Sequence, residues 1–330
     1  MEAGLVERAG LPFEGIRAGG VRGMGPLTLA RNVSRLAVGY TQAEGILGRF
    51  KPDVVFATGG YVGVPVVVAA RRRSIPSLVY LPDIEPGWAV KALGRLVDRI
   101  CVTSGASRQY LPAAKVVETG YPVRPELNAP ADKAAARSAL GLDPTQPTVL
   151  IFGGSRGARR INQAALGAAE KLAMLCQVVH VTGELDAQAA QERVATMLGT
   201  VRHRYHLYPY LHEMPQALRA ADLVVSRAGA STLGEFPAAG LPAILVPLPI
   251  SGGHQWPNAR FLADAGGATI VPDEELDAAR LLREVTALLG DPTGLADRAA
   301  AMRRLARPEA ARRIGEGLLA LAKVQAGAAV

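Results

Sequence analysis

A glycine-rich turn that follows an apolar run is the most informative chemical feature of the sequence. Residues Thr148–Phe152 have the pattern of a β-strand, and Gly153-Gly154-Ser155-Arg156-Gly157-Ala158 comes directly after it, ahead of a helical stretch from Arg159 to Leu172. The glycines permit close approach of a ligand, and the N–H groups at a helix N-terminus, together with the Ser155 hydroxyl, suit phosphate oxygens. A tight strand-to-helix turn without a ligand has a similar composition. The turn therefore predicts a phosphate site only together with its surroundings.

A second such turn is formed by Arg227-Ala228-Gly229-Ala230-Ser231-Thr232-Leu233-Gly234-Glu235, again after a strand-like run. A carboxylate on the first turn of a helix that faces the same crevice suits a bidentate hold on two ribose hydroxyls. The alternative for Glu235 is a carboxylate that only caps its helix. The two turns together favour ribose binding.

Two further segments carry polar groups after strand-like runs. The loop from Pro247 to Asn258 presents the His254 imidazole and the Gln255 amide, which suit sugar hydroxyls or, alternatively, bond to backbone and water. In the first part of the chain, Thr58-Gly59-Gly60-Tyr61 follows Val54–Ala57 and suits an anionic group, and a plain tight turn with a glycine at positive φ explains it equally well.

Parallel sheets must position these turns, because short β-branched runs alternate with helical stretches along the chain. The expected strands of the first part are Val54–Ala57, Ser77–Tyr80, Arg99–Val102 and Ala114–Val117, and those of the second part are Thr148–Phe152, Gln177–Val181, Tyr205–Tyr208, Leu223–Ser226, Ala243–Val246 and Thr269–Val271. Prolines at 122, 125 and 130 predict a linker between the two parts. The fold class is α/β with two doubly wound domains.

Composition narrows the function classes. The chain has 330 residues, and 37 Lys and Arg against 29 Asp and Glu give a formal net charge of +8. The basic residues are not interleaved with aromatics, which disfavours nucleic-acid binding. No apolar run reaches the ~20 residues of a membrane span, and no signal-peptide pattern is found, so we expect a cytoplasmic protein with at most a peripheral membrane contact.

One segment is a candidate for that membrane contact. Its apolar and basic residues alternate around a predicted helix, and they are Leu27, Leu29, Val33, Leu36 and Val38 with Arg22, Arg31 and Arg35. An amphipathic helix that packs on its own sheet has the same pattern. The pattern alone leaves both interpretations open.

Five ordered motifs resemble a known family over nearly the whole chain. They are Lys51–Pro65 (KPDVVFATGGYVGVP), Thr119–Arg124 (TGYPVR), Gly153–Ala158 (GGSRGA), Arg227–Glu235 (RAGASTLGE) and His254–Ala259 (HQWPNA). The chain is similar to the UDP-N-acetylglucosamine:undecaprenyl-diphospho-muramoyl-pentapeptide N-acetylglucosaminyltransferases, the MurG family. The resemblance implies a GT-B fold of two Rossmann-like domains that face a cleft.

The resemblance also implies an activity: inverting transfer of N-acetylglucosamine from UDP-N-acetylglucosamine to the lipid-linked muramoyl pentapeptide, without a metal or another cofactor, at the inner face of the cell membrane. We place an acceptor domain at residues 1–125, a donor domain at 126–306, and a C-terminal helix at 307–330 that packs back toward the first domain. Alternatives are another UDP-sugar transferase of the GT-B type and a non-catalytic protein that binds nucleotide sugars.

Residue roles follow from the resemblance, position by position. In the donor site it implies backbone groups of Leu211 at uracil with Tyr210 beside the ring, Glu235 at the ribose, Arg124 and Ser155 at the diphosphate, Thr232 in support, and Gln255 and Asn258 at the sugar, with Gly153, Gly154 and Gly157 as the phosphate cradle. In the acceptor site it implies Thr58, Gly59, Gly60 and Tyr61.

The chain departs from the family pattern in two places. The family opens with a strand and a glycine-rich loop bearing a histidine, and the chain is expected to begin after them, so that the first domain is incomplete at its start. The family also has His-Glu-Gln-Asn where this chain has Tyr80-Leu81-Pro82-Asp83. Inverting transfer requires a group that accepts the acceptor's proton. Asp83 and Glu85 are the candidates in this region.

Overall fold

The computed structural model describes residues 2–20, 25–129, 132–154, 158–249 and 253–328. The chain forms two compact units: unit 1 contains Met1–Leu81, Pro86–Glu118 and Arg312–Val330, and unit 2 contains Pro82–Glu85 and Thr119–Ala311. Where the sequence places the domain boundaries at 125/126 and 306/307, the chain passes from unit to unit after Glu118 and after Ala311.

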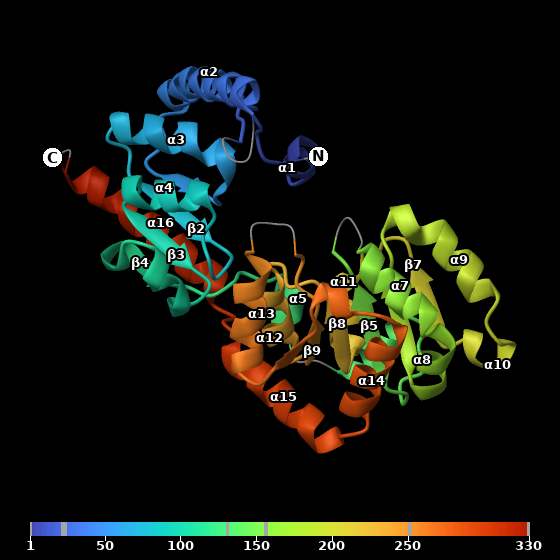
Figure 1. Cartoon of the computed structure of the whole chain (residues 1–330). Coiled ribbons are helices and arrows are strands. Elements are labelled where there is room, and N and C mark those ends of the chain that lie inside the picture. Colours follow the sequence, from blue (N-terminus) through green and yellow to red (C-terminus); the bar gives the residue numbers. More distant parts are fainter. Residues whose placement is uncertain (1, 21–24, 130–131, 155–157, 250–252, 329–330) are drawn as a thin grey trace. The chain divides into compact units, whose positions relative to one another are not determined.

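Unit 1 is a parallel sheet covered by helices (Figure 1). Its described strands lie in the order β1-β2-β3-β4 and are β1 Val55–Ala57, β2 Ser77–Leu81, β3 Arg99–Val102 and β4 Val116–Glu118. The helices are α1 Glu2–Arg8, α2 Pro26–Phe50, α3 Gly60–Arg72, α4 Trp88–Leu96 and, at the C-terminus, α16 Ala310–Ala328, with 3₁₀ turns at Gly105–Tyr110 and Ala113–Lys115.

Successive side chains of β2 face opposite sides of this sheet, as the strand period requires. Val79 joins a buried cluster with Val67 of α3 and Leu93 of α4. Leu78, its neighbour in sequence, lies close to Gly317 of α16, where an added Cβ would come within 3.3 Å of the leucine. The C-terminal helix therefore packs on unit 1, on the face opposite to α3 and α4.

Unit 2 is a larger parallel sheet with helices on both faces (Figure 1). Its strands lie in the order β10-β9-β8-β5-β6-β7 and are β5 Thr148–Phe152, β6 Gln177–Val181, β7 Tyr205–Tyr208, β8 Leu223–Ser226, β9 Ala243–Leu245 and β10 Ala268–Ile270. The helices are α5 Pro125–Asn128, α6 Lys133–Ala139, α7 Arg159–Gly167, α8 Ala169–Leu175, α9 Ala187–Ala195, α10 Gly199–Arg202, α11 Met214–Ala220, α12 Thr232–Ala239, α13 Gln255–Asp264, α14 Ala278–Leu289 and α15 Pro292–Leu305, with 3₁₀ turns at Glu184–Asp186 and Asp273–Glu275.

The strand order of unit 2 determines where a ligand can bind. From β5 the chain runs outward through β6 and β7, and then returns to place β8 on the other side of β5. The order therefore reverses between β5 and β8, and in such sheets ligands bind beside the carboxyl ends of the strands at this switch point. The glycine-rich turn at Gly153 and the turn at Arg227 follow these two strands.

The expected strands are confirmed to within one or two residues, and the two-domain α/β fold is confirmed. Three local expectations were wrong. The loop expected from Pro247 to Asn258 ends before Gln255, because Gln255–Asp264 form α13. The strand predicted at Ala114–Val117 begins at Val116, because Ala113–Lys115 form a 3₁₀ turn after Pro112. The single helix predicted from Arg159 to Leu172 is divided at Ala168, next to Gly167, where an added Cβ would lie 2.9 Å from Ala278 of α14.

Candidate functional site

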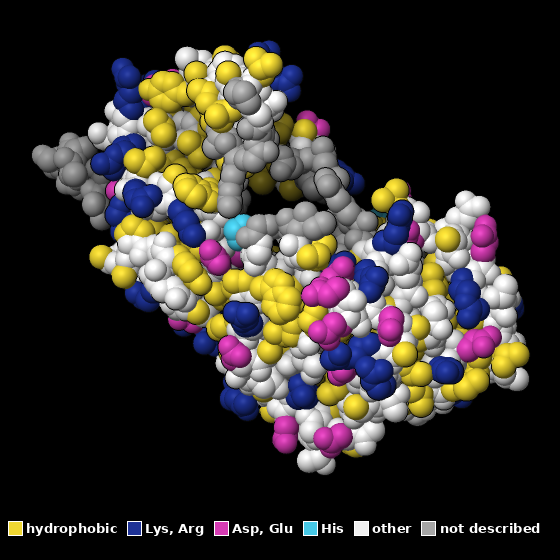
Figure 2. All heavy atoms as spheres, viewed as in Figure 1, with side chains coloured by type: hydrophobic (Ala, Val, Ile, Leu, Met, Phe, Trp, Pro, Cys, Tyr) yellow, Lys and Arg dark blue, Asp and Glu magenta, His cyan; other side chains and the backbone are white. Residues whose placement is uncertain are grey.

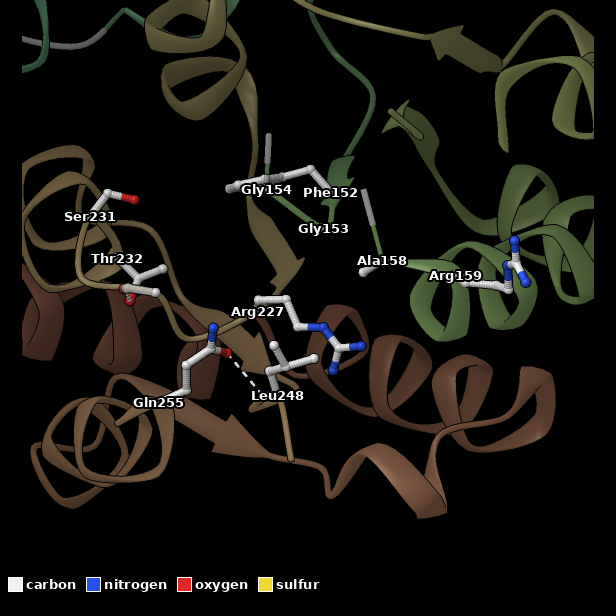
Figure 3. A pocket seen from close by; sticks show the side chains of 11 residues that line it. Phe152, Gly153, Gly154, Ala158, Arg159, Arg227, Ser231, Thr232, Leu248 and Gln255 are labelled. Atoms are coloured by element: carbon white, nitrogen blue, oxygen red, sulfur yellow. Dashed lines mark hydrogen bonds between the residues drawn. The ribbon is translucent and has the colours of Figure 1, made fainter. Parts of the chain in front are cut away.

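A cavity of about 460 Å³ lies at the switch point of unit 2 (Figure 3). Residues from the ends of β5 and β8, from the starts of α7, α12 and α13, and from the loop after β9 line it: Phe152, Gly153, Gly154, Ala158, Arg159, Arg227, Gly229, Ser231, Thr232, Leu248 and Gln255. Four of the expected donor-site residues are thus brought together here, namely Gly153, Gly154, Thr232 and Gln255.

The glycine-rich turn forms one wall of this cavity. Gly154 has φ +90°, a backbone conformation that glycine adopts easily, and no atom of the described residues lies within 4 Å of the position of a Cβ. The N-terminus of α7 follows at Arg159. Ser155 and Gly157, expected to contact phosphate, lie outside the described residues. The described part of the turn has the open backbone that a phosphate cradle requires.

Hydrogen bonds hold the second turn in shape at the opposite wall. The Thr232 hydroxyl donates to the carbonyl oxygen of Gly229 at 2.7 Å. The Gln255 side-chain oxygen accepts from the backbone N–H of Ala228 at 3.2 Å and from that of Leu248 at 2.9 Å. Gln255 therefore joins the turn after β8 to the loop after β9, and its amide group lies beside the cavity (Figure 3).

Arg227 lines the cavity although sequence reasoning gave it no role. Its side chain is only 12% exposed, and its guanidinium donates to the Val246 carbonyl oxygen and pairs with Asp273. The buried Nε of Arg227 has no hydrogen-bond partner among the described residues. Its place at the start of the turn motif was the only signal in the sequence.

Glu235 lies on α12, one turn beyond Ser231. Burial raises the pKa of the Glu235 carboxyl, while a hydrogen bond from the Ser231 hydroxyl and the positive charge of Arg124 act in the opposite direction. Arg124, at the start of α5, is exposed. Neither Glu235 nor Arg124 lines the cavity. The positive charge of Arg124 favours the ionised form of the Glu235 carboxyl.

A glycine brings the Arg124 segment against α12. A Cβ added at Gly234 would lie 2.5 Å from Cδ1 of the Tyr121 ring, so only glycine leaves room for this ring. Burial raises the pKa of the Tyr121 hydroxyl, and the nearby carboxylates of Glu235 and Asp83 raise it further. Tyr121 therefore lies in the same electrostatic environment as both carboxylates.

Asn258, expected to face the sugar, is fully buried on α13. Its side chain bonds to the backbone of Ala228 and to Asp83 and Ile84 of the segment Pro82–Glu85. Burial raises the pKa of the Asp83 carboxyl, and the hydrogen bond from Asn258 and the neighbouring His254 lower it. The buried Nδ1 of His254 has no hydrogen-bond partner in the described part of the chain.

The remaining expected donor residues follow β7. Tyr210 is 58% exposed, and its ring stands edge-on to that of His212 at a centroid distance of 4.7 Å. The side chain of Leu211 is buried in the core cluster that also contains Ala228 and Leu233. The structure thus anchors Leu211 by its side chain and leaves the Tyr210 ring accessible.

The expected acceptor turn in unit 1 follows β1 and begins α3. Gly59 has φ +90° and Gly60 has φ +72°, so the turn depends on both glycines. A Cβ at Gly59 would lie 2.9 Å from the Val90 side chain. Thr58 is exposed and Tyr61 is half-buried. Glu85, the second candidate base, is also half-buried.

Known glycosyltransferase domains match both parts of the chain. Residues 1–102 match the glycosyltransferase family 28 N-terminal domain, and residues 148–314 match the glycosyltransferase family 28 C-terminal domain. A protein of Roseiflexus sp. (strain RS-1) named UDP-N-acetylglucosamine--N-acetylmuramyl-(pentapeptide) pyrophosphoryl-undecaprenol N-acetylglucosamine transferase is 39% identical, over 95% of this chain and 80% of its own length. This chain belongs to the MurG family of glycosyltransferases.

Further MurG-family relatives and a solved structure extend the comparison. A Bacillus cereus protein with the same name, numbered 1, is 37% identical over 98% of this chain and 88% of its own length. The crystal structure of MurG from Acinetobacter baumannii superposes with a TM-score of 0.75 at 27% identity, covering 97% of this chain and 88% of that one. A UDP-GlcNAc 2-epimerase from Neisseria meningitidis, at 16% identity and a TM-score of 0.63, shares the fold.

Proposed function

We propose that this chain transfers N-acetylglucosamine from UDP-N-acetylglucosamine to a muramoyl pentapeptide carried on undecaprenyl diphosphate. Membership of the MurG family supports this reaction, since the relatives that share most of the chain are named for it. The single observation that supports the proposal in the structure is the cavity between the turns after β5 and β8, which is lined by the open backbone of Gly153 and Gly154 together with Thr232 and Gln255.

In this proposal the donor lies across the switch point of unit 2. The diphosphate occupies the cradle that includes Gly153 and Gly154, with Ser155, Gly157 and Arg124 as further ligands. Glu235 holds the ribose, Thr232 supports the turn, and Gln255 contacts the sugar. Tyr210 and the backbone of Leu211 receive the uracil. Arg227 is an additional candidate for the diphosphate, because its buried Nε has no partner among the described residues.

The chemistry needs stabilisation of a leaving group and removal of a proton. As the bond to the sugar breaks, negative charge develops on UDP, and positive side chains and the N-terminus of α7 stabilise that charge without a metal ion. The acceptor hydroxyl attacks the anomeric carbon and loses its proton to a base. Asp83 is the stronger candidate for this base, since burial raises its pKa toward the working range of a base. Glu85 is the second candidate.

A transfer assay tests the reaction directly. The full chain is incubated with UDP-N-acetylglucosamine and a polyprenyl-diphosphate muramoyl pentapeptide, and formation of the disaccharide lipid and of UDP is measured. We expect both products in equal amounts. Binding of UDP in calorimetry without any transfer would instead favour a nucleotide-sugar-binding protein, and neither binding nor transfer would contradict the proposal.

The acceptor and the membrane contact are assigned to unit 1. The turn Thr58–Tyr61 is proposed to receive the acceptor diphosphate. Side chains of α2 leave apolar surface exposed, with Leu27 at 87% and Val33 at 53%, next to the exposed Arg31 and Arg35. Figure 2 shows hydrophobic side chains gathered over this part of unit 1, with Lys and Arg beside them. Arg22 lies outside the described residues.

We propose that this part of α2 contacts the cytoplasmic face of the membrane. Helices that lie at a membrane surface combine such apolar and basic residues. No helix in the described part of the chain has the length and hydropathy of a membrane span. Leu27→Ser should weaken co-sedimentation with phosphatidylglycerol vesicles. Leu185→Ser in unit 2, where the leucine is 86% exposed, is the matched control and should leave it unchanged. Equal binding by both variants would contradict the membrane contact.

A further inference from the structure

A short segment of chain between two elements of unit 1 is anchored in the core of unit 2. Pro82–Glu85 follow β2 of unit 1 directly, yet they belong to unit 2. Ile84 is 4% exposed and lies in the buried cluster that also contains Ala228, Leu233 and Ala259. Burial of Ile84 places this segment against α12 and α13. An apolar contact of this kind does not determine where the polar groups of the segment, such as the Asp83 carboxylate, point.

One side chain fixes that direction. Asn258 is 0% exposed, and its Oδ1 accepts from the backbone N–H of Ile84 at 3.0 Å. Its Nδ2 donates to Oδ1 of Asp83 at 2.8 Å and to the carbonyl oxygen of Ala228 at 3.1 Å. Both donor hydrogens of the amide and its oxygen are thus used, which leaves the nitrogen no further hydrogen for a sugar hydroxyl.

The first turn of α13, which carries Asn258, also holds the turn Arg227–Ala230. Gln255 lies three residues before Asn258 on α13, so the two side chains project from one face of the helix. Gln255 accepts from the N–H of Ala228, and Asn258 donates to the C=O of that residue. The backbone of Ala228 is therefore held from both sides, and its turn leads directly into α12, which carries Glu235.

We propose that Asn258 is a positioning residue that fastens the segment Pro82–Glu85, and with it the carboxylate of Asp83, to the turn Arg227–Ala230 of the donor site. This role rests on the proposed transfer reaction. It differs from contact with the donor sugar, because the amide acts through Asp83 and Ala228. Displacement of a reacting group by about 1 Å lowers rates by about 100-fold, so the fastening should affect turnover more than nucleotide binding.

The first test replaces the amide. Asn258→Ala should lower kcat/KM for UDP-N-acetylglucosamine by about 100-fold, mostly through kcat, and should leave the Kd for UDP in calorimetry within about threefold, which is the split expected of a group that acts on positioning rather than on binding. Without any substrate, hydrogen exchange at the Ile84 amide should become faster. Unchanged kcat/KM, or unchanged exchange at Ile84, would overturn the proposal.

A matched control separates positioning from loss of stability. Asn162 is also buried in unit 2, at 1% exposure, and its side chain makes three hydrogen bonds, to Thr182, Asp186 and His180. Asn162→Ala should lower the melting temperature about as much as Asn258→Ala while keeping kcat/KM within about threefold. An equal loss of activity in both variants would mean that Asn258 acts only through stability, and would overturn the proposal.

A swap keeps the test valid if the alanine variant unfolds. Asn258→Asp sets two carboxylates against each other, whereas Asn258→Asp combined with Asp83→Asn restores their hydrogen bond with donor and acceptor exchanged. Protection at Ile84 should fall in the single variant and return in part in the double variant, with kcat/KM rising toward that of Asp83→Asn alone. The return is partial because an aspartate at 258 cannot donate to the Ala228 carbonyl oxygen. A double variant no better protected than Asn258→Asp would contradict the fastening.

If the wild-type chain binds UDP but transfers no sugar, the proposed reaction fails, and normal Ile84 protection would show that the contact itself exists.

Discussion

The turn after β1 in unit 1 and the turn after β5 in unit 2 share one construction and differ in their surroundings. Each joins a parallel strand to a helix and depends on glycine at φ +90°, at Gly59 and Gly154 respectively. An added Cβ at Gly59 meets Val90, whereas a Cβ at Gly154 has no atom of the described part of the chain within 4 Å. The first glycine is needed for packing as well as for its backbone conformation, while the second leaves space open for a ligand.

The charges around the two turns differ as well. In unit 2 the cationic Arg227 lines the cavity beside the turn at Gly153, and burial raises the pKa of the Glu235 carboxyl on α12. In unit 1 the exposed side chains near the sheet and α3 include the apolar Phe56, Val62 and Trp88. The same strand-turn-helix construction therefore has packed, apolar surroundings in unit 1 and an open, charged cavity in unit 2.

Removal of the Glu235 carboxylate, which we propose binds the ribose, should have the largest effect on UDP binding. Glu235→Gln should weaken UDP binding by about 10- to 150-fold, because a hydrogen bond to a charged group contributes about 1.5–3 kcal/mol. Isothermal calorimetry on the full chain measures it. Glu126→Gln changes an exposed glutamate of unit 2 and is the control. Equal affinity of the two variants would show that Glu235 does not hold the ribose.

Alanine at the two glycines should separate packing from binding. Both substitutions place a side chain at φ +90°, which costs about 1–3 kcal/mol of folding free energy. Gly59→Ala should cost more than Gly154→Ala in chemical denaturation, because Val90 must also move. Only Gly154→Ala should weaken UDP binding. The reverse pattern of binding would place the nucleotide in unit 1 and refute the comparison.

Substitution at the contact between Tyr121 and Gly234 should have an intermediate effect on stability and on UDP binding. Gly234→Ala should lower stability by about 1–3 kcal/mol, since the Cβ overlaps the tyrosine ring, and should weaken UDP binding by shifting Arg124. Adding Tyr121→Ser removes the overlap and should recover much of the stability. Gly199→Ala, where nothing lies within 4 Å, is the control. A double variant that is no more stable than Gly234→Ala would exclude this explanation.

The smallest expected effect is a dependence on pH. Burial raises the folded-state pKa of Glu235 above its ordinary value of 4.5, so its ionisation opposes folding. Stability from this group is fully present below about pH 4.5 and is lost as the pH rises through the raised pKa. Glu235→Gln should therefore melt higher than the wild type at pH 7, with the difference shrinking toward pH 4. A difference that grows on acidification would have the wrong sign.

Much of this architecture could be predicted from local sequence. Runs such as Leu223–Ser226 and Gln177–Val181 are short and rich in valine, and each became a buried parallel strand with the expected bounds. The glycine turns were recognisable because Gly154 and Gly59 follow such strands directly. A local sequence pattern does not predict structure that depends on contacts between residues distant in sequence. At Gly167, packing against Ala278 accompanies the division of the predicted helix.

The candidate site was predictable only in part, for the same reason. Turn residues such as Thr232 and Gln255 were found because motif and strand end coincide. The burial of Asn258 was not, since its partner Ile84 is 174 residues away and no periodicity links the two. Arg227 was missed as well, because its pairing with Asp273 and the burial of its Nε, which has no hydrogen-bond partner among the described residues, arise only in the folded unit.

Hydrogen exchange with UDP-N-acetylglucosamine tests the central claim, that the donor occupies the switch point of unit 2, most directly. The full chain is measured with and without the donor, peptide by peptide. Exchange should become slower in peptides that cover Gly153–Gly154 and Arg227–Glu235, and should not change in those that cover Thr58–Tyr61. Protection confined to Thr58–Tyr61, with Arg227–Glu235 unaffected, would contradict it.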